Sequence, residues 1–494
     1  MLYKLLKIGI GGKFYQLMKH MYETSTSCVK LSSGLSPEFN MELGIKQGDC
    51  LSPLLFNLFI NDIGDIFSST SDPVKLGDID LSYLLYADDL LLLSTSREGL
   101  QHNLNKLNCY AKKWHLDINI KKTNAVIFQK YGKKVKPTFE LGETRIDTCK
   151  TYSYLGITFD QNCNFKTATD DLKTKASKAQ FSLFSALSSS DVLDVNIYTK
   201  LFDSLIKPIA TYGCEVWLPN QIKKITLSNI SKIDTLPFEK LHNTFCKRTL
   251  GIYRSISNVL ARLELGRLPL LFSTATQVIK YWSYIMSKPK QSILYNAYHT
   301  EYENDSNWVI IVKNLLFICG FQNQWDNQTP LDLKVDLPII KRKLKHVLLN
   351  LYKNSPCQIP ELLTEYNYID DEIHPQPYLL SKVPRYLKIS ISRLRLQSNR
   401  LEIVRGRYNR PKVPKEQRLC SSCKLIDDEV HLLTNCTLIN NLRNTTFKTI
   451  SDDKDSFIAL SDRDKAHTLL HPCTYEETLA FGHFIYKAFQ QRNL

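Results

Sequence analysis

The sequence Leu-Ser-Tyr-Leu-Leu-Tyr-Ala-Asp-Asp-Leu-Leu-Leu-Leu at residues 81–93 places two adjacent carboxylates between two apolar segments. Both segments have the composition of short buried strands, so the four residues Tyr86, Ala87, Asp88 and Asp89 fall at the turn of a predicted hairpin. Adjacent aspartates in apolar surroundings are costly unless a cation or a partner compensates them. Such oxygen ligands suit Mg²⁺, which bridges phosphate oxygens during nucleotidyl transfer. The alternative interpretation is a solvated turn, because Asp is also a good turn former.

Around this hairpin, the first 160 residues alternate helical and strand patterns. We expect helices over 2–22 (with a break at its glycines), 51–67 and 97–115, and strands over 28–31, 38–43, 81–94, 124–128, 139–146 and 154–159. The pattern is helical and basic from about 165 to 300, and helical but less regular from 300 to 380. The mixture predicts an α+β fold with a mainly helical second half.

Length and charge bound the class of protein. The chain has 494 residues, which at roughly 150 residues per domain predicts about three folding units. Its 43% hydrophobic and 11% aromatic content excludes wholesale disorder. Lys and Arg exceed Asp and Glu by 64 to 49, a net charge of +15 that favours nucleic acid as the partner, with an anionic membrane surface second. The alternative is a protein that is basic without such a partner.

Neither a membrane span nor a signal peptide is expected. No apolar run reaches the roughly 18 residues that a span needs, and the longest candidate, 51–60, is interrupted by polar residues and a proline. The first residues lack an apolar core followed by a cleavage site. Ten of the thirteen cysteines are scattered singly, which favours a reduced, intracellular compartment.

The string Tyr-Ala-Asp-Asp between apolar strands resembles motif C of reverse transcriptases, and four further segments resemble the same family in the same order. Gly-Ile-Lys-Gln-Gly-Asp-Cys-Leu-Ser-Pro at 44–53 is similar to motif B, Asn-Ile-Lys-Lys-Thr at 119–123 to motif D, Tyr-Leu-Gly-Ile at 154–157 to the primer-grip hairpin, and Tyr-Gly-Cys-Glu-Val-Trp at 212–217 to a thumb segment of non-LTR retrotransposon polymerases. Each segment alone has an ordinary explanation. Together and in order, they identify the chain as a member of the non-LTR retrotransposon reverse transcriptases.

The resemblance implies a partial right-hand polymerase palm, with an antiparallel sheet and helices, followed by a mainly helical thumb and C-terminal region. The expected divisions are the palm over 1–160, the thumb over 161–300, a helical connector over 301–380 and a basic C-terminal region over 381–494. The implied reaction is attack of a primer 3′-hydroxyl on a deoxynucleoside triphosphate, assisted by Mg²⁺. The implied partners are an RNA template and a DNA primer or target.

The resemblance also implies roles for individual residues. Asp88 would be the catalytic Mg²⁺ ligand and Asp89 an auxiliary catalytic carboxylate. The other implied contacts are Gln47, Gly48 and Tyr86 at the incoming nucleotide, Lys122 at its triphosphate, and Tyr154, Leu155 and Gly156 in the primer grip.

One departure from the family matters more than any match. Its palm needs another Asp, from motif A, which precedes a helix similar to residues 2–10 and would lie upstream of Met1. We therefore expect an N-terminally truncated polymerase, without fingers, that is inactive alone. The alternative is a catalytically dead remnant that only binds nucleic acid.

A cysteine and histidine cluster near the C-terminus has the spacing of a zinc site. Cys420-x2-Cys423-x7-His431-x4-Cys436 supplies three thiolates and one imidazole for a tetrahedral structural Zn²⁺. The alternatives are four unligated residues, or His471 and Cys473 as substitute ligands. The arginine-rich run before this cluster, followed by the zinc-knuckle-like pattern, resembles the tail of non-LTR retrotransposon proteins, where a knuckle holds RNA or the target-primed complex.

The stretch 382–424 carries thirteen cations against two acids. Self-repulsion on this scale favours an anionic partner over a merely solvated helix face. Tyr386 and Tyr408 are candidates for stacking on bases. The predicted nucleic-acid contacts are Arg393, Arg395, Arg400, Arg405, Arg407 and Arg410. The expected location is a ribonucleoprotein in the nucleus and cytoplasm.

Overall fold

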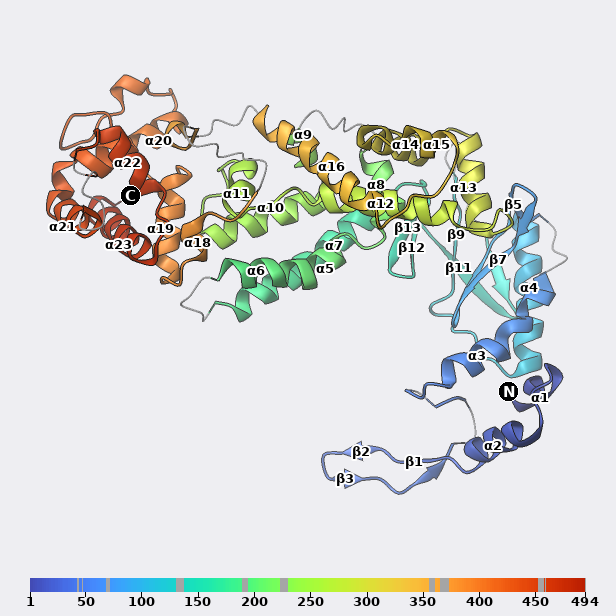
Figure 1. Ribbon diagram of the computed structural model, residues 1–494. Coiled ribbons are helices and arrows are strands. Elements are labelled where there is room, and N and C mark those ends of the chain that lie inside the picture. Colours follow the sequence, from blue (N-terminus) through green and yellow to red (C-terminus); the bar gives the residue numbers. More distant parts are fainter. Residues whose placement is uncertain are drawn as a thin grey trace. The chain divides into compact units, whose positions relative to one another are not determined.

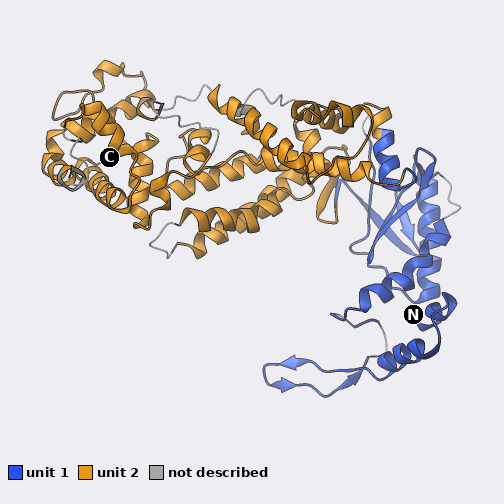
Figure 2. Ribbon diagram, in the orientation of Figure 1, with its two compact units in different colours: residues 1–152, 290–300 blue, residues 153–289, 301–494 orange. Residues whose placement is uncertain are grey.

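A computed structural model describes residues 1–493 apart from 42, 43, 47, 68–71, 130–136, 189–193, 223–229, 355–359, 365–372, 452–456 and 458 (Figure 1). The chain divides into two compact units, residues 1–152 with 290–300, and residues 153–289 with 301–494 (Figure 2). Helices and strands build the first unit and mainly helices the second, which confirms the α+β class. The four-part division stays a prediction. Among the described residues, no helix is long and apolar enough to cross a membrane.

The first unit follows the predicted order of helices and strands closely. Its helices are α1 (Leu2–Lys7), α2 (Gly12–Glu23), α3 (Ser52–Ile60), a 3₁₀ segment (Asn61–Phe67) and α4 (Arg97–Trp114). Its strands are β1 (Thr26–Ser27), β2 (Lys30–Leu31), β3 (Gly34–Leu35), β4 (Phe39–Asn40), β5 (Val74–Leu76), β6 (Ile79–Leu81), β7 (Tyr83–Tyr86), β8 (Asp89–Leu92), β9 (Asn124–Val126), β10 (Phe139–Leu141) and β11 (Thr144–Cys149). Next along the chain, β12 (Thr151–Tyr154) pairs with β13 (Ile157–Asp160).

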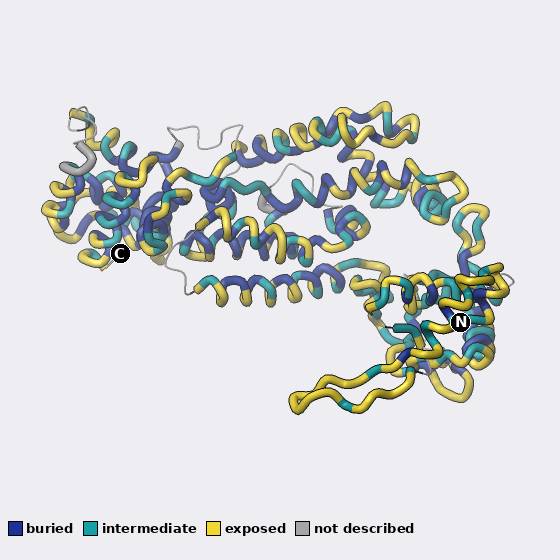
Figure 3. The backbone as a smooth tube through the Cα atoms, turned by 60° about the horizontal axis from the view of Figure 1, so that its bottom comes forward, coloured by how far each residue is buried: buried dark blue, intermediate teal, exposed yellow. Residues whose placement is uncertain are grey.

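The strands form several small sheets. Within the described residues, β5–β6 and β7–β8 are separate antiparallel pairs, and β9 runs parallel to β11 in a three-stranded sheet with β10. The expectation of one antiparallel sheet is therefore too simple, because β9 and β11 pair in parallel and the described strands divide among separate small sheets. The long β1–β4 hairpin is almost entirely exposed (Figure 3).

Helix α4 separates the two apolar cores that support the β7–β8 hairpin. One core contains buried Ile60, Ile63, Phe67 and Tyr110, against which Tyr83, Leu85, Leu90 and Leu92 pack. The other contains buried Leu104, Ala125, Phe139, Leu141 and Ile146. The helix begins where the Ser96 hydroxyl accepts a hydrogen bond from the Gly99 N–H, and it ends at His115 in the left-handed conformation. Helical periodicity thus places apolar residues on two sides of α4.

The second unit is built from helices of 4 to 21 residues. They are α5 (Lys166–Ala186), α6 (Val195–Leu201), a π segment (Phe202–Ile206), α7 (Lys207–Ala210), α8 (Cys214–Ile222), α9 (Ile230–Ile233), α10 (Pro237–Leu250), α11 (Asn258–Glu264), α12 (Leu271–Met286), α13 (Ile293–Glu303, mostly in the first unit), α14 (Asn307–Cys319), α15 (Gln322–Asp326), α16 (Asp336–Lys353), α17 (Glu361–Thr364), α18 (Pro377–Leu380), α19 (Arg385–Arg395), α20 (Glu402–Tyr408), a second π segment (His431–Asn435), α21 (Asn440–Ser451), α22 (Asp462–Leu470) and α23 (Tyr475–Arg492). Short 3₁₀ turns cover Lys415–Gln417 and Thr437–Ile439.

Two buried arginines hold these helices together. Arg262 of α11 donates hydrogen bonds to Asp234 at 2.6 Å and to the Tyr352 hydroxyl at 2.8 Å. Arg395 of α19 donates to Glu264 of α11 at 2.7 Å, and both side chains are at most 1% exposed. Since a buried charge without a partner is costly, these pairs fix the register between helices distant in sequence.

Candidate functional site

The two aspartates lie at the tip of the predicted β7–β8 hairpin. The register pairs Tyr86 with Asp89, which leaves Ala87 and Asp88 as a two-residue loop. Ala87 adopts the left-handed conformation, with φ of +52°, as tight hairpin turns require. Asp88 and Asp89 are both exposed at this tip, which fits either a metal site or the alternative of a solvated turn. The predicted hairpin is confirmed, while the catalytic roles stay predictions.

The strand pattern explains how the tip is held. Leu85 and Leu90 pair across the hairpin and pack on the core beneath it. Because side chains alternate along a strand, Tyr86 and Asp89 project to the opposite face. Tyr86 is 64% exposed there. The carboxylates are therefore solvent-accessible but stand on a rigid, packed support.

The motif B turn precedes α3. Gly48 has a φ of +87°, which explains the need for glycine, and Gln47 lies outside the described residues. The Ser52 hydroxyl donates to the Lys46 carbonyl at 2.5 Å, and the Leu51 N–H donates to Asp49 at 3.1 Å. These bonds shape the start of α3. The expected closeness of this turn to the hairpin tip stays a prediction.

Lys122 lies in a turn before β9. Its N–H donates to the Asn119 carbonyl at 3.1 Å, its carbonyl accepts a hydrogen bond from the Tyr152 hydroxyl at 3.0 Å, and its side chain is exposed. The backbone is thus fixed while the ammonium group stays accessible.

The primer-grip motif and the thumb motif are in direct contact. Leu155 and Gly156 form the β12–β13 turn with φ values of +47° and +84°, while Tyr154 ends β12. The Tyr212 hydroxyl donates to the Leu155 carbonyl at 3.1 Å, and its ring lies 3.1 Å from where a Cβ on Gly156 would stand. The Trp217 indole donates to the Tyr212 carbonyl at 2.8 Å. The sequence shows both motifs but not this contact.

A buried lysine near the N-terminus was missed by sequence reasoning. The Lys4 ammonium donates to Asp62 at 2.6 Å, to the Tyr110 hydroxyl at 2.9 Å and to the Phe59 carbonyl at 2.6 Å. It also lies 3.8 Å from the ring centroid of Trp114. Burial lowers the pKa of Lys4, despite Asp62. Burial opposes ionisation of Asp62, but hydrogen bonds from Lys4 and Tyr110 outweigh it and lower the pKa of this carboxyl. The signal in the sequence was a lysine on the apolar face of a helix.

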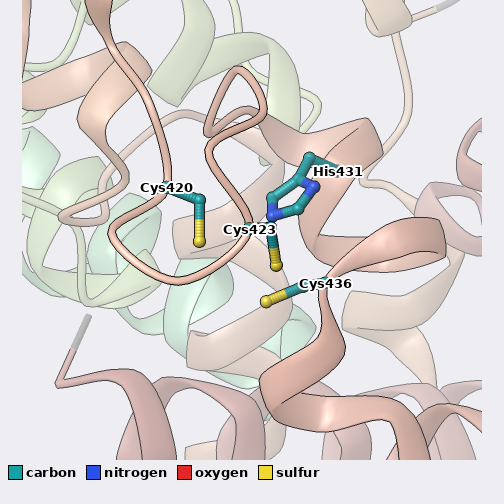
Figure 4. A group of neighbouring side chains, drawn as sticks. All are labelled: Cys420, Cys423, His431 and Cys436. Carbon is teal, nitrogen blue, oxygen red and sulfur yellow. The ribbon is translucent and has the colours of Figure 1, made fainter.

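The predicted zinc ligands converge (Figure 4). One possible ligand atom from each of Cys420, Cys423, His431 and Cys436 lies within 4.8 Å of all the others. The first two flank a tight turn in which the Cys420 N–H donates to the Leu425 carbonyl at 2.8 Å. The Cys436 N–H donates to the His431 carbonyl at 2.8 Å, which closes the second half of the cluster.

The chemistry of this cluster fits a metal. Both ring nitrogens of buried His431 lack a hydrogen-bond partner among the described residues, and burial lowers the pKa of this imidazole, which keeps it neutral. The Thr437 N–H lies 3.4 Å from the Cys423 sulfur, and the Arg492 guanidinium lies 3.7 Å from the Cys420 sulfur. Such donors stabilise thiolates.

His471 and Cys473 do not join this group of four. The His471 ring nitrogen contacts the His467 carbonyl at 2.9 Å, and the Cys473 thiol donates to the His471 carbonyl at 3.3 Å. The described structure therefore gives the two alternative ligands local partners instead.

The six predicted arginine contacts divide by burial. The prediction that Arg395 contacts nucleic acid is wrong, because its guanidinium is buried in an ion pair with Glu264. Arg393 is half-buried and donates to the Gly251 carbonyl at 2.8 Å. Arg407 is half-buried and donates to Gln397 at 2.7 Å. The exposed members are Arg400, Arg405 and Arg410. Helix α19 therefore buries two of its cations, Lys388 and Arg395.

Of the two candidate stacking residues, Tyr386 lies edge-on to Tyr486, with ring centroids 4.7 Å apart, and is 43% exposed. Tyr408 is 64% exposed. Tyr408 is thus the more accessible of the two rings.

Comparison with known proteins agrees with the motifs. Residues 3–159 match the family model described as "Reverse transcriptase (RNA-dependent DNA polymerase)". The probable RNA-directed DNA polymerase from transposon X-element of Drosophila melanogaster is 24% identical to this chain, over 43% of the chain and 23% of its own length. The RNA-directed DNA polymerase from mobile element jockey of the same organism is 27% identical, over 44% of the chain and 24% of its own length. The Pol polyprotein from retrotransposable element R2DM is 30% identical over 30% of this chain and 14% of its own length.

The matches thus span about a quarter or less of these longer relatives. The family model covers the region that holds the hairpin, the motif B turn and Lys122. Residues 3–159 carry a reverse transcriptase domain, and the chain is similar to the RNA-directed DNA polymerases of non-LTR retrotransposons.

Proposed function

We propose that the first 160 residues supply part of the palm of an RNA-directed DNA polymerase that copies retrotransposon RNA. The observation that carries this proposal is the pair of exposed carboxylates, Asp88 and Asp89, on a packed two-residue hairpin tip within the matched domain. Asp88 would hold a Mg²⁺ ion, with Asp89 as an auxiliary carboxylate. Bound Mg²⁺ would supply charge stabilisation while a primer 3′-hydroxyl attacks the α-phosphate of a deoxynucleoside triphosphate and pyrophosphate leaves.

The remaining motifs bind the incoming nucleotide and the primer. Gln47 and Gly48 form the floor for the incoming nucleotide, and Tyr86 flanks it. The exposed ammonium of Lys122 contacts the triphosphate. Its positive charge compensates the negative charge of phosphate groups that have lost their water shell. The turn formed by Tyr154, Leu155 and Gly156 orients the primer end, supported by its contact with Tyr212. An RNA template and a DNA primer or target complete the assembly.

A site-directed cleavage experiment tests the metal assignment without requiring activity. Fe²⁺ replaces Mg²⁺ in the 494-residue chain, and hydroxyl radicals then cut the backbone near the bound ion. We expect cuts near residue 88 that excess Mg²⁺ suppresses and that Asp88→Asn abolishes. Asp80→Asn, an exposed carboxylate on neighbouring β6, is the matched control. Cleavage that is unchanged by Asp88→Asn would contradict the assignment.

We further propose that these 494 residues alone do not extend a primer. Among their motifs we find none like motif A, so the two carboxylates lack the third that the family uses. Robust Mg²⁺-dependent extension on an RNA template would refute this point and would mean that another acid substitutes. The alternative function, nucleic-acid binding without polymerase activity, predicts binding but no Fe²⁺ cleavage near residue 88.

We propose a structural Zn²⁺ held by Cys420, Cys423, His431 and Cys436. Their convergence, together with the unpartnered imidazole, supports a four-coordinate site. Metal analysis of the reduced full chain should give about one equivalent of zinc. Cys423→Ser should lose it, and Cys473→Ser, at an exposed cysteine outside the cluster, should keep it. Equal zinc content in both variants would rule out this ligand set.

We propose that the exposed arginines around α20 bind nucleic acid through its phosphates. Each phosphate contact should contribute about −0.7 to the slope of log affinity against log salt for single strands. Replacing the exposed Arg405 and Arg410 together by Ala should therefore flatten that slope by about 1.4 units and weaken binding to all sequences alike. Salt-insensitive binding by the parent chain would refute the electrostatic interpretation.

A further inference from the structure

A pocket of about 260 Å³ opens on the second unit, between the α10–α11 connection, the segment that follows α19, and α20. Tyr253, Arg405 and Tyr408 line it together with Gln397 and Asn399. We propose that this pocket receives one unpaired base of a single-stranded nucleic acid, with the adjoining phosphate on Arg405. The proposal rests on the nucleic-acid binding proposed above and adds the place and mode of recognition.

Aromatic rings supply the recognition. Tyr408 is 64% exposed and Tyr253 is 43% exposed, although large aromatic rings are usually covered. The rings come from elements about 150 residues apart in sequence and meet at one pocket. Every base has a π-face, so a base that enters can stack on such rings. A pocket of this size lies just below the ~300–1,000 Å³ of sites for drug-sized ligands, which favours a single base.

The charge around the pocket is positive. Arg405 is exposed and lies 2.7 Å from Glu402, which holds it at the rim. The guanidinium of Arg393 lies 6.0 Å from the ring centroid of Tyr253. An apolar ligand would make no ion pair with the arginines at the pocket. An acidic peptide would pair with the arginines but would not stack on the exposed rings of Tyr253 and Tyr408. A nucleotide uses both, since its base stacks while its phosphate pairs with a guanidinium.

The pocket walls are tied to one another. The Tyr253 N–H donates to the Ser398 hydroxyl at 2.8 Å, and Arg393 donates to the Gly251 carbonyl at 2.8 Å. Arg407 of α20 donates to Gln397, which lines the pocket, at 2.7 Å. The backbone that carries the rings is therefore fixed in advance, which lowers the entropic cost of ordering them on binding.

The amide side chains have structural partners. The Gln397 oxygen accepts from Arg407, and the Asn399 oxygen accepts from the Leu401 N–H at 3.1 Å. These oxygens shape the pocket. We therefore expect stacking to dominate and base preference to be weak.

The test uses the full chain and a short single-stranded oligonucleotide that carries one 2-aminopurine, whose fluorescence falls on stacking. RNA and DNA versions distinguish the two sources of an unpaired base. We expect quenching on binding, and affinity lowered roughly 5- to 150-fold by Tyr408→Ala, the range for one lost base–aromatic stack. Tyr408→Phe keeps the ring and should keep both signals. Tyr475→Ala, at a tyrosine that is 49% exposed and outside the pocket, is the matched control.

Other outcomes are decisive. If both oligonucleotides bind with normal salt dependence but Tyr408→Ala changes neither affinity nor quenching, the pocket proposal fails while the electrostatic proposal stands. If neither binds, both proposals fail. If poly-glutamate competes as well as the oligonucleotide, or duplex binds as tightly as single strands, base insertion is excluded. A loss of affinity in Tyr475→Ala equal to that in Tyr408→Ala would also overturn the assignment.

Discussion

Arg395 offers a direct test of whether a predicted nucleic-acid residue is structural. Its side chain is 1% exposed and donates to Glu264 at 2.7 Å, to the Gln376 side chain at 2.9 Å and to the Leu470 carbonyl. Arg395→Ala would remove this cation from the buried Glu264 carboxylate, which also accepts a hydrogen bond from the Tyr378 hydroxyl at 2.6 Å. Removing one partner of a buried ion pair costs about 3–5 kcal/mol. Opening of α11 and α19 should therefore become roughly 150- to 5,000-fold more frequent.

Hydrogen exchange measured by mass spectrometry on the full chain reports this opening locally, so no two-state assumption is needed. Peptides from α11 and α19 should exchange hydrogen faster in Arg395→Ala than in the parent chain. Their exchange rates should be unchanged in Arg405→Ala, because the Arg405 side chain is 61% exposed. Replacing both Arg395 and Glu264 by Leu should recover part of the loss, since an apolar pair needs no compensation. Normal protection in Arg395→Ala, together with weaker nucleic-acid binding, would refute the structural role and restore the original prediction.

Three other perturbations have clear expected outcomes. Lys4→Met should destabilise α1 by about 1–3 kcal/mol, seen as faster hydrogen exchange there, because it removes the cation that joins two hydrogen-bonding side chains. Burial raises the pKa of Glu239 to about 7, above its unfolded value, so its contribution to stability is lost as pH rises from about 4.5 through 7. Glu239→Gln should therefore gain in thermal stability relative to the parent chain between pH 5 and pH 8, and a constant difference would count against this. Gly266→Ala should lose about 1–3 kcal/mol in urea unfolding, because its Cβ would stand 2.3 Å from the Pro375 nitrogen. Gly320→Ala, with φ of +86° and no atom within 4 Å, should lose less.

Much of the first unit was predictable because its signals are local. The two short apolar runs that flank Tyr86 to Asp89 and the helical period over 97–114 each specify a local element without long-range information. The sheet was less predictable. Parallel pairing of β9 with β11 joins segments about twenty residues apart, and nothing within either segment shows that partner. Strand pairing is a tertiary property, so propensity alone leaves it undetermined.

For the site residues too, local signals were predictable from the sequence and long-range contacts were not. Spacing predicted the convergence of the four proposed zinc ligands, because the short chain segments between them leave few possible arrangements. Spacing did not reveal that Arg395 is buried, because its partner Glu264 lies 131 residues earlier. Lys4 was missed for the same reason, since Asp62 is 58 residues away. A basic stretch shows its net charge in sequence, but which cations reach solvent depends on distant carboxylates.

Asp427 connects the proposed metal and base sites. Its carboxylate accepts hydrogen bonds from the Glu402 N–H at 3.0 Å and from Arg492 at 2.8 Å, and its carbonyl accepts from the Ile403 N–H at 3.1 Å. It therefore fixes the first turn of α20, the helix that carries Arg405 and Tyr408. Since Asp427 lies in the short segment between two proposed ligands, Cys423 and His431, binding of the proposed Zn²⁺ would order the segment that supports this helix. The proposed zinc site would thus help a small cation-rich region to hold Arg405 and Tyr408 in defined positions, despite repulsion between its positive charges.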